Sequence, residues 1–348
     1  MLGKVLTEAL ADLEQIRLLI GGFRSLRERD ASHGPDMDFV IFDGVSAGQL
    51  KLFEYCTSII RTYTIFERLV YALAEGWIGW VLKHNAASIL ANPTCRSAFE
   101  TGVAEIFRRQ TEPRFSDIDR FSLSKSHSLF DPKLASQQPY ELAIIPFLAT
   151  LPNLRIEHIC SLFSNVALGS PAQWLEDSPQ LISLRDEYSL GHLETLKEIV
   201  LRRNEVAHGN PDPGQFLGTN ELLARIEIIS ALAISLHQFL LVTASELELG
   251  KNFEKGLIGE ITHCWPKNRA VELTMSCSVL VVGEKILVVE KAECFASYIE
   301  SIQIEGQNTT GFSGSCGTQL GIKMGRTPRQ GARLLRASAI REFDSLLS

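Results

Sequence analysis

Three neighbouring side chains have the types and the spacing that phosphodiester chemistry needs. They are Arg203, Asn204 and His208, within the string Arg-Asn-Glu-Val-Ala-His that ends at position 208. A guanidinium can neutralise a phosphate, an amide can orient a ribose hydroxyl or an imidazole, and an imidazole can move a proton. RNA supplies its own nucleophile, the 2′-hydroxyl, so this chemistry needs no metal ion or other cofactor.

The element that must position these side chains is an amphipathic helix, expected from about Gly191 to Ala207. The string Gly-Asn-Pro-Asp-Pro-Gly over 209–214 ends it, because several helix-stopping residues follow one another. Arg203 lies three or four residues beyond the last apolar residues of this helix and continues the apolar face. A charge on a face that should be buried needs a partner. The alternative interpretation is a capping arginine beside a solvated histidine. The apolar stripe consists of Leu190, Leu193, Leu196, Ile199 and Val200.

Glu67 is the candidate partner for Arg203. It follows Tyr63-Thr-Ile-Phe on a helix expected from about Ser46 to Leu82, among apolar neighbours. We expect Glu67 to hold Arg203 in place or to accept a proton, and the alternative is an ordinary surface glutamate.

Other candidate sites carry less chemistry. Seven scattered cysteines, an odd number without a Cys-x-x-Cys pair, indicate neither a disulfide framework nor a zinc knuckle. The pairs His158-Ile-Cys160 and His263-Cys264 have no further ligands at metal spacing. We therefore predict no metal and no cofactor.

The residue pattern changes near residue 250. Before it, helical periodicity predicts a bundle, with breaks at Asn92-Pro93 and over the polar residues 111–132. After it, six short β-branched runs alternate with turn residues, which is typical of a small barrel. We predict a mainly α fold, with a helical-bundle domain over 1–249 and a β-barrel domain with a basic tail over 250–348. The expected helices are 1–29, 46–82, 99–109, 140–148, 156–166, 191–207 and 219–249, and the expected strands are 257–262, 270–275, 279–282, 285–289, 297–304 and 318–324.

The net charge of −7 requires any contact with nucleic acid to be local. Residues 251–348 hold 12 Lys and Arg against 10 Asp and Glu, and the run from Lys323 to Arg341 has six basic residues and no acid. That run is a candidate RNA-contacting surface or simply a solvated face.

The acidic N-terminal start is unlike a signal peptide, and the apolar segment 226–244 contains Glu227, His237 and Gln238, so we expect a buried helix and a cytoplasmic protein.

The string Arg203-Asn204-x-x-Ala207-His208-Gly209 at the end of a late helix resembles the signature of the HEPN family of ribonucleases. In that family an Arg and a polar residue precede a His by four to six intervening positions. The resemblance covers about residues 1–248, where the motif and the helical pattern carry it. It implies a homodimeric helical bundle with a composite active site, in which an interface places Arg203 opposite the partner's charges and the substrate.

The C-terminal barrel resembles the second domain of translation GTPases such as elongation factor Tu. Four segments carry the likeness, in order: 256–263, 282–286, 299–304 and 317–323. No Gly-x-x-x-x-Gly-Lys-Ser/Thr loop is present, so the GTPase itself is absent. The resemblance implies a docking module for tRNA, the ribosome or a translation protein.

We therefore expect a metal-independent endoribonuclease that cuts tRNA or ribosome-associated RNA, as a toxin or phage-defence effector with an antitoxin or translation-machinery partner. Two alternatives remain open. One is a non-catalytic HEPN-type dimer that binds a nucleotide or scaffolds a protein. The other is a translation-associated adaptor whose active part is the barrel.

Overall fold

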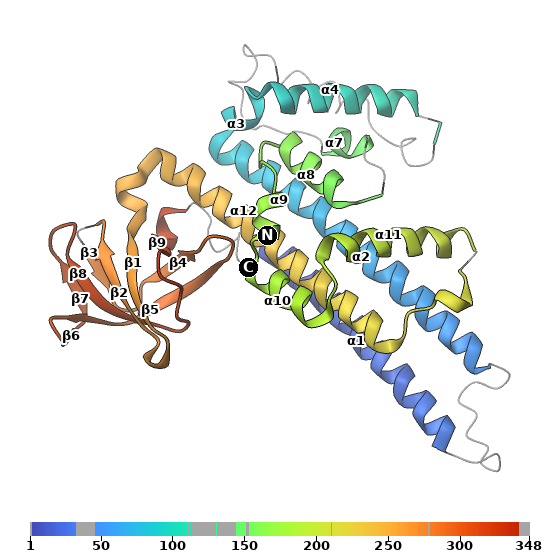
Figure 1. Ribbon diagram of the computed structural model, residues 1–348. Helices are drawn as coiled ribbons and strands as arrows, with labels where there is room; N and C mark the ends of the chain where they lie inside the picture. Colours follow the sequence, from blue (N-terminus) through green and yellow to red (C-terminus); the bar gives the residue numbers. More distant parts are fainter. Residues whose placement is uncertain are drawn as a thin grey trace. The chain divides into compact units, whose positions relative to one another are not determined.

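A computed structural model describes residues 2–32, 46–109, 111–112, 130, 144–150, 153–209, 211–277 and 279–340. Helices precede a small C-terminal barrel, so the predicted mainly α fold is confirmed (Figure 1). The chain forms two compact units: a helical unit of 2–172 and 180–234, and a barrel unit that includes 173–179 and 235–348. The helices are α1 (Leu2–Ser32), α2 (Ala47–Asn85), α3 (Ala87–Leu90), α4 (Pro93–Arg108), α7 (Ile145–Ala149), α8 (Ile156–Asn165), α9 (Ala172–Glu176), α10 (Pro179–Tyr188), α11 (His192–Ala207) and α12 (Thr219–Gly256).

The helical unit is built around α2. This helix begins with a capping box, in which the Ser46 hydroxyl accepts from the Gln49 N–H and the Gln49 side chain accepts from the Ser46 N–H. Its buried face continues through Tyr63 and Phe66 to Trp77, whose indole N–H donates to the Val166 carbonyl at 2.9 Å. A helix of this length, apolar on one face, gives α1, α8 and α11 a common surface to pack against.

Several expected helix boundaries were wrong for identifiable reasons. The predicted break at Asn92-Pro93 does separate α3 from α4, but α4 begins at Pro93 and not at 99. The Asn92 side chain accepts from the N–H groups of the next residues, and Pro93 occupies the first turn. Helix α12 continues past Gly250 to Gly256 and leads directly into the first strand. The short helices α9 and α10 were not predicted. Of the predicted helix 140–148, residues 145–148 form most of α7 (Ile145–Ala149), and residues 140–143 lie outside the described residues. Most of the segment 111–132 also lies outside them.

A polar network fixes α11 within the helical unit. Arg202 bonds to Glu198 at 2.8 Å, to the Tyr55 hydroxyl of α2 at 3.0 Å and to the Gln215 carbonyl at 2.7 Å. Arg225 of α12 bonds to the other oxygen of Glu198 at 2.7 Å. Burial raises the pKa of Glu198, but the bonds from Arg225 and Arg202 lower it more, so the net pKa lies below its ordinary value. Both arginines of this network therefore have an acidic partner, the shared carboxylate of Glu198.

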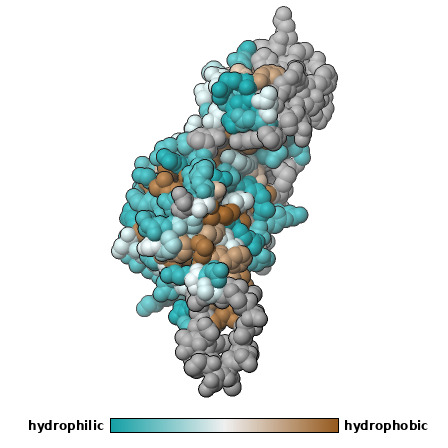
Figure 2. All heavy atoms as spheres, turned by 90° about the vertical axis from the view of Figure 1, so that its right-hand side faces the viewer, coloured by the Kyte–Doolittle hydropathy of each residue, from teal (hydrophilic) through white to brown (hydrophobic). Residues whose placement is uncertain are grey.

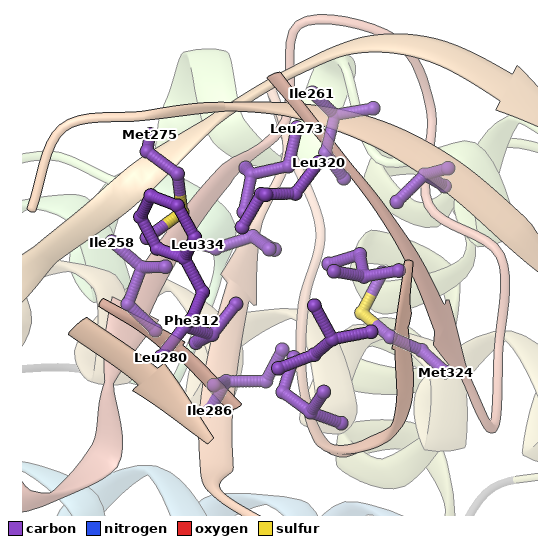
Figure 3. Close-up of a cluster of buried hydrophobic side chains, with 14 of the residues drawn as sticks. Ile258, Ile261, Leu273, Met275, Leu280, Ile286, Phe312, Leu320, Met324 and Leu334 are labelled. Carbon is purple, nitrogen blue, oxygen red and sulfur yellow. The ribbon is translucent and has the colours of Figure 1, made fainter. Parts of the chain in front are cut away.

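Six strands close the barrel, in the order β4-β9-β1-β2-β8-β5 and back to β4. Aliphatic side chains of alternate residues fill its interior, as Figure 3 shows for residues such as Ile261, Leu273 and Leu320. Strand β9 was not predicted, although it completes the closure. The strands are β1 (Leu257–Trp265), β2 (Ala270–Met275), β3 (Val279–Val281), β4 (Lys285–Val289), β5 (Cys294–Ile304), β6 (Gln307–Thr309), β7 (Gly311–Ser313), β8 (Gln319–Met324) and β9 (Arg333–Arg336).

Helix α12 also passes a membrane-span criterion. Its Thr219–Glu248 part is long and apolar enough to cross a bilayer, by length and composition only. In the structure, 67% of the most apolar window is buried within the protein. The core helices of soluble proteins meet the same criterion, so this feature decides nothing about localisation.

Candidate active site at the end of helix α11

Arg203 lies on the buried face of α11, as the sequence indicated. Leu196, Ile199 and Val200 are buried, and Arg203 continues their row as a half-buried side chain. Leu193, which the sequence placed on the same stripe, is 37% exposed instead. The buried face begins at His192 and Thr195, so the true stripe is turned by about one position from the predicted one.

The Arg203 guanidinium is held without an acidic partner. Its carbon lies 5.0 Å from the centre of the Tyr63 ring, and Nη1 donates to Asn204 Oδ1 at 3.1 Å and, at a longer 3.4 Å, to Asn153 Oδ1. Among the residues that the structure describes, no Asp or Glu forms an ion pair with Arg203. A ring face and neutral oxygens stabilise the cation but leave its charge uncompensated, which is the state needed to receive an anion.

Glu67 does not contact Arg203, contrary to our expectation. Its carboxylate accepts the Tyr63 hydroxyl at 2.8 Å, and the Leu154 N–H donates to that hydroxyl at 3.0 Å. Burial, and then the bond to Glu67, raises the pKa of Tyr63 well above its ordinary value, so the phenol keeps its proton. Glu67 therefore reaches Arg203 only through the Tyr63 ring that it orients.

Asn204 is oriented by two donors. Its Oδ1 accepts from Arg203 Nη1 at 3.1 Å and from Asn153 Nδ2 at 3.0 Å. With its oxygen doubly engaged, the amide group of Asn204 is left as a free donor among the described residues. The sequence did not indicate Asn153 as a candidate. It lies 50 residues before Arg203 and 51 before Asn204, so no local spacing connects them.

His208 is the C-cap residue of α11, and its side chain is exposed. Its backbone N–H donates to the Asn204 carbonyl at 3.0 Å, and Gly209 follows with a φ of +71°, a conformation that ends helices readily. Within one chain the structure brings Arg203, Asn204, Tyr63 and Asn153 together. The His208 side chain makes no hydrogen bond to them, and its ring has no partner among the described residues.

His208 shares an exposed face of α11 with two leucines. In an ideal helix, positions 193, 197, 201, 204 and 208 fall within about 80° of arc. Leu193 and Leu201 on this face are 37% and 46% exposed. Figure 2 shows the right-hand side of Figure 1, where α11 ends. On this side, apolar patches interrupt a mostly hydrophilic surface. Solvent-facing leucines beside a motif histidine give this face the character of a contact surface.

The basic C-terminal run is not the free positive surface that the sequence suggested. Within the described part of that run, every basic side chain forms an ion pair with a glutamate, so its field is largely neutralised. Arg341 lies outside the described residues. The pairs are Lys323–Glu300, Arg326–Glu293, Arg329–Glu290, Arg333–Glu246 and Arg336–Glu284.

Comparison with known proteins adds no further evidence on the site. No protein-family model matches the sequence, and no curated protein is significantly similar to it.

Proposed function

We propose that the protein is a metal-independent endoribonuclease of the HEPN type, with its active site at the end of α11. The observation that carries the proposal is the Arg203 guanidinium. It is half-buried, it stacks on Tyr63, and it has no acidic partner among the described residues, one turn before an exposed histidine on the same helix. A half-buried cation without an acidic partner is less stable than a paired one. Such a cation is explained if its role is to bind an anionic substrate.

The chemistry assigns one role to each residue. The RNA 2′-hydroxyl attacks the adjacent phosphorus, the bond to the 5′-oxygen breaks, and the products are a 2′,3′-cyclic phosphate and a 5′-hydroxyl. Arg203 stabilises the charge of the pentacoordinate phosphate, and the free amide of Asn204 donates to a phosphate or ribose oxygen. His208 transfers a proton to or from the reacting oxygens. Glu67 acts through the Tyr63 ring beneath Arg203.

The active unit in this proposal is a homodimer with a composite cleft. In one chain, positions 203 and 208 point in directions about 140° apart on an ideal helix, so a single α11 does not aim both at one phosphate. The exposed leucines Leu193 and Leu201 lie on the His208 side of that helix and offer the apolar surface for a second copy. Two copies packed along this face would bring two sets of Arg203 and His208 to one cleft.

The barrel is proposed to select the RNA, with tRNA and ribosome-associated RNA as the favoured targets. His263 and Trp265 are exposed at the end of β1 with ring centroids 4.7 Å apart. Lys267 and Arg269 follow in the turn to β2, and neither has an acidic partner among the described residues. Exposed rings beside unpaired cations are the features that unpaired nucleotides stack on and bind to. A toxin or phage-defence role would follow from cleavage of such RNA.

The experiment is an RNA-cleavage assay on tRNA and ribosomal RNA in the presence of EDTA. The parent protein should cut, and Arg203→Ala and His208→Ala should each lower the rate by about 100-fold or more. Arg185→Ala is the matched control, because its side chain is exposed and lies outside the site. Equal cleavage by His208→Ala and the parent would refute the assignment, and an uncleaving parent would favour a non-catalytic dimer.

A further inference from the structure

Asn153 connects the site to a second histidine. Its side chain binds Asn204 and Arg203, while its backbone carbonyl lies 2.7 Å from Nδ1 of His158. His158 is the third residue of α8, a helix that packs against both α2 and α11. A single residue therefore joins the ring of His158 to the guanidinium of Arg203 and the amide of Asn204.

The contact with Asn153 decides which ring nitrogen of His158 carries the proton. A carbonyl oxygen can only accept, so Nδ1 at 2.7 Å must be the N–H donor. The Arg155 N–H also points toward Nδ1, at 3.4 Å, and a protonated Nδ1 cannot accept it. The two contacts exclude each other, and the shorter one prevails because hydrogen bonds weaken steeply with distance. In the neutral ring, Nε2 is then the unprotonated nitrogen.

The Nε2 atom of His158 is available for chemistry. The ring is half-buried, and Nε2 has no hydrogen-bond partner among the described residues. An imidazole whose Nδ1–H is fixed by an oxygen and whose Nε2 is free has the orientation that general bases use. We propose that His158 is the second proton-transfer residue of the site and that Asn153 is its positioning residue. This inference rests on the ribonuclease function proposed above.

The two histidines then divide the proton transfers of cleavage. His158 Nε2 removes the proton from the 2′-hydroxyl while the new bond from the 2′-oxygen to phosphorus forms. The bond from phosphorus to the 5′-oxygen breaks, and the protonated ring of His208 gives its proton to that leaving oxygen. One proton is taken up and one is released, no water is consumed, and exchange with solvent restores both rings. Arg203 and Asn204 stabilise the phosphate between these steps.

The test is His158→Gln, measured as kcat, KM and the pH profile of RNA cleavage with EDTA present. The side-chain amide of glutamine can donate to the Asn153 carbonyl, as the Nδ1–H of His158 does, but it cannot transfer a proton. We expect kcat to fall by about 100-fold or more and one limb of the pH profile to disappear. The melting temperature should stay that of the parent. Arg185→Gln, at an exposed position of α10 outside the site, should leave kcat, KM and the pH profile unchanged.

A second measurement does not depend on cleavage. Nitrogen-15 NMR of the histidine rings should show His158 in the Nδ1–H form. Asn153→Ala retains the backbone carbonyl, so it should keep that form and lower kcat only through the lost side-chain bonds to Arg203 and Asn204. An Nε2–H ring in the parent, or full cleavage with an unchanged pH profile in His158→Gln, would overturn the role of His158 alone. A parent protein that does not cleave RNA would overturn this proposal together with the proposed function, so the two failures are distinguishable.

Discussion

Arg202 and Arg203 are adjacent on α11, and replacing each with methionine should have opposite consequences. Methionine keeps much of the volume of arginine and removes the charge. Arg202 pairs with Glu198 at 2.8 Å, with side chains only 15% and 25% exposed, so its loss leaves a half-buried carboxylate with fewer donors. Discounting a buried-pair loss for this exposure, we expect Arg202→Met to cost about 2–3 kcal/mol, or about 5–10 °C in melting temperature.

Arg203→Met should change the free energy of unfolding by an amount near zero. The variant loses a cation–π contact worth about 1 kcal/mol and two hydrogen bonds to amide oxygens worth about 2–3 kcal/mol together. It also removes the cost of a half-buried cation without an acidic partner, which is of similar size, and a thioether packs well on the Tyr63 ring. The melting temperature should therefore stay within about 4 °C of the parent, while RNA cleavage falls about 100- to 1000-fold.

Differential scanning fluorimetry and the EDTA cleavage assay measure both quantities on the same protein samples. A loss of stability in Arg203→Met as large as that of Arg202→Met would contradict this prediction. Arg203 would then be a structural residue, and the uncompensated charge would have no functional meaning.

Three further predictions concern other parts of the chain. Glu198→Gln should lower the melting temperature at neutral pH. Because the folded pKa of Glu198 is lowered, the difference in melting temperature between parent and variant should be complete above about pH 5 and disappear as pH falls through that pKa. Leu201→Glu should shift the protein from dimer to monomer in sedimentation velocity and lower cleavage, whereas Leu18→Glu, at a more exposed leucine of α1, should do neither. Trp265→Ala should weaken binding of an uncleavable 2′-O-methyl RNA by about 1–3 kcal/mol in fluorescence anisotropy, while Tyr298→Ala, also exposed, should leave it unchanged.

Local patterns in the sequence were sufficient for the elements that carry them. Sequence periodicity predicted the bounds of α2 and α11 to within a few residues, because each helix has a strong apolar face and clear end signals. For α11 the end signal is the stop after Ala207. Strands β2 and β4 matched their expected bounds. Strand β9 was missed because only four residues form it, and its role in closing the barrel depends on pairing with β1 and β4.

The site itself could be predicted only in part. Arg203, Asn204 and His208 share one helix, so their spacing was visible. Tyr63 and Asn153 reach the site through tertiary contacts, which no local spacing encodes. The ion pairs of the basic run after Lys323 could not be predicted for the same reason, since its glutamate partners come from distant segments.

The most direct test of the account is the chemistry of the cleaved ends. The substrate is a DNA copy of a mapped cleavage site that contains one ribonucleotide, incubated with the protein in EDTA and analysed by mass spectrometry. We predict a single cut after the ribonucleotide, with a 2′,3′-cyclic phosphate and a 5′-hydroxyl, and no cut in His208→Ala or in an all-DNA copy. A 5′-phosphate end, or equal cleavage of the all-DNA copy, would contradict it.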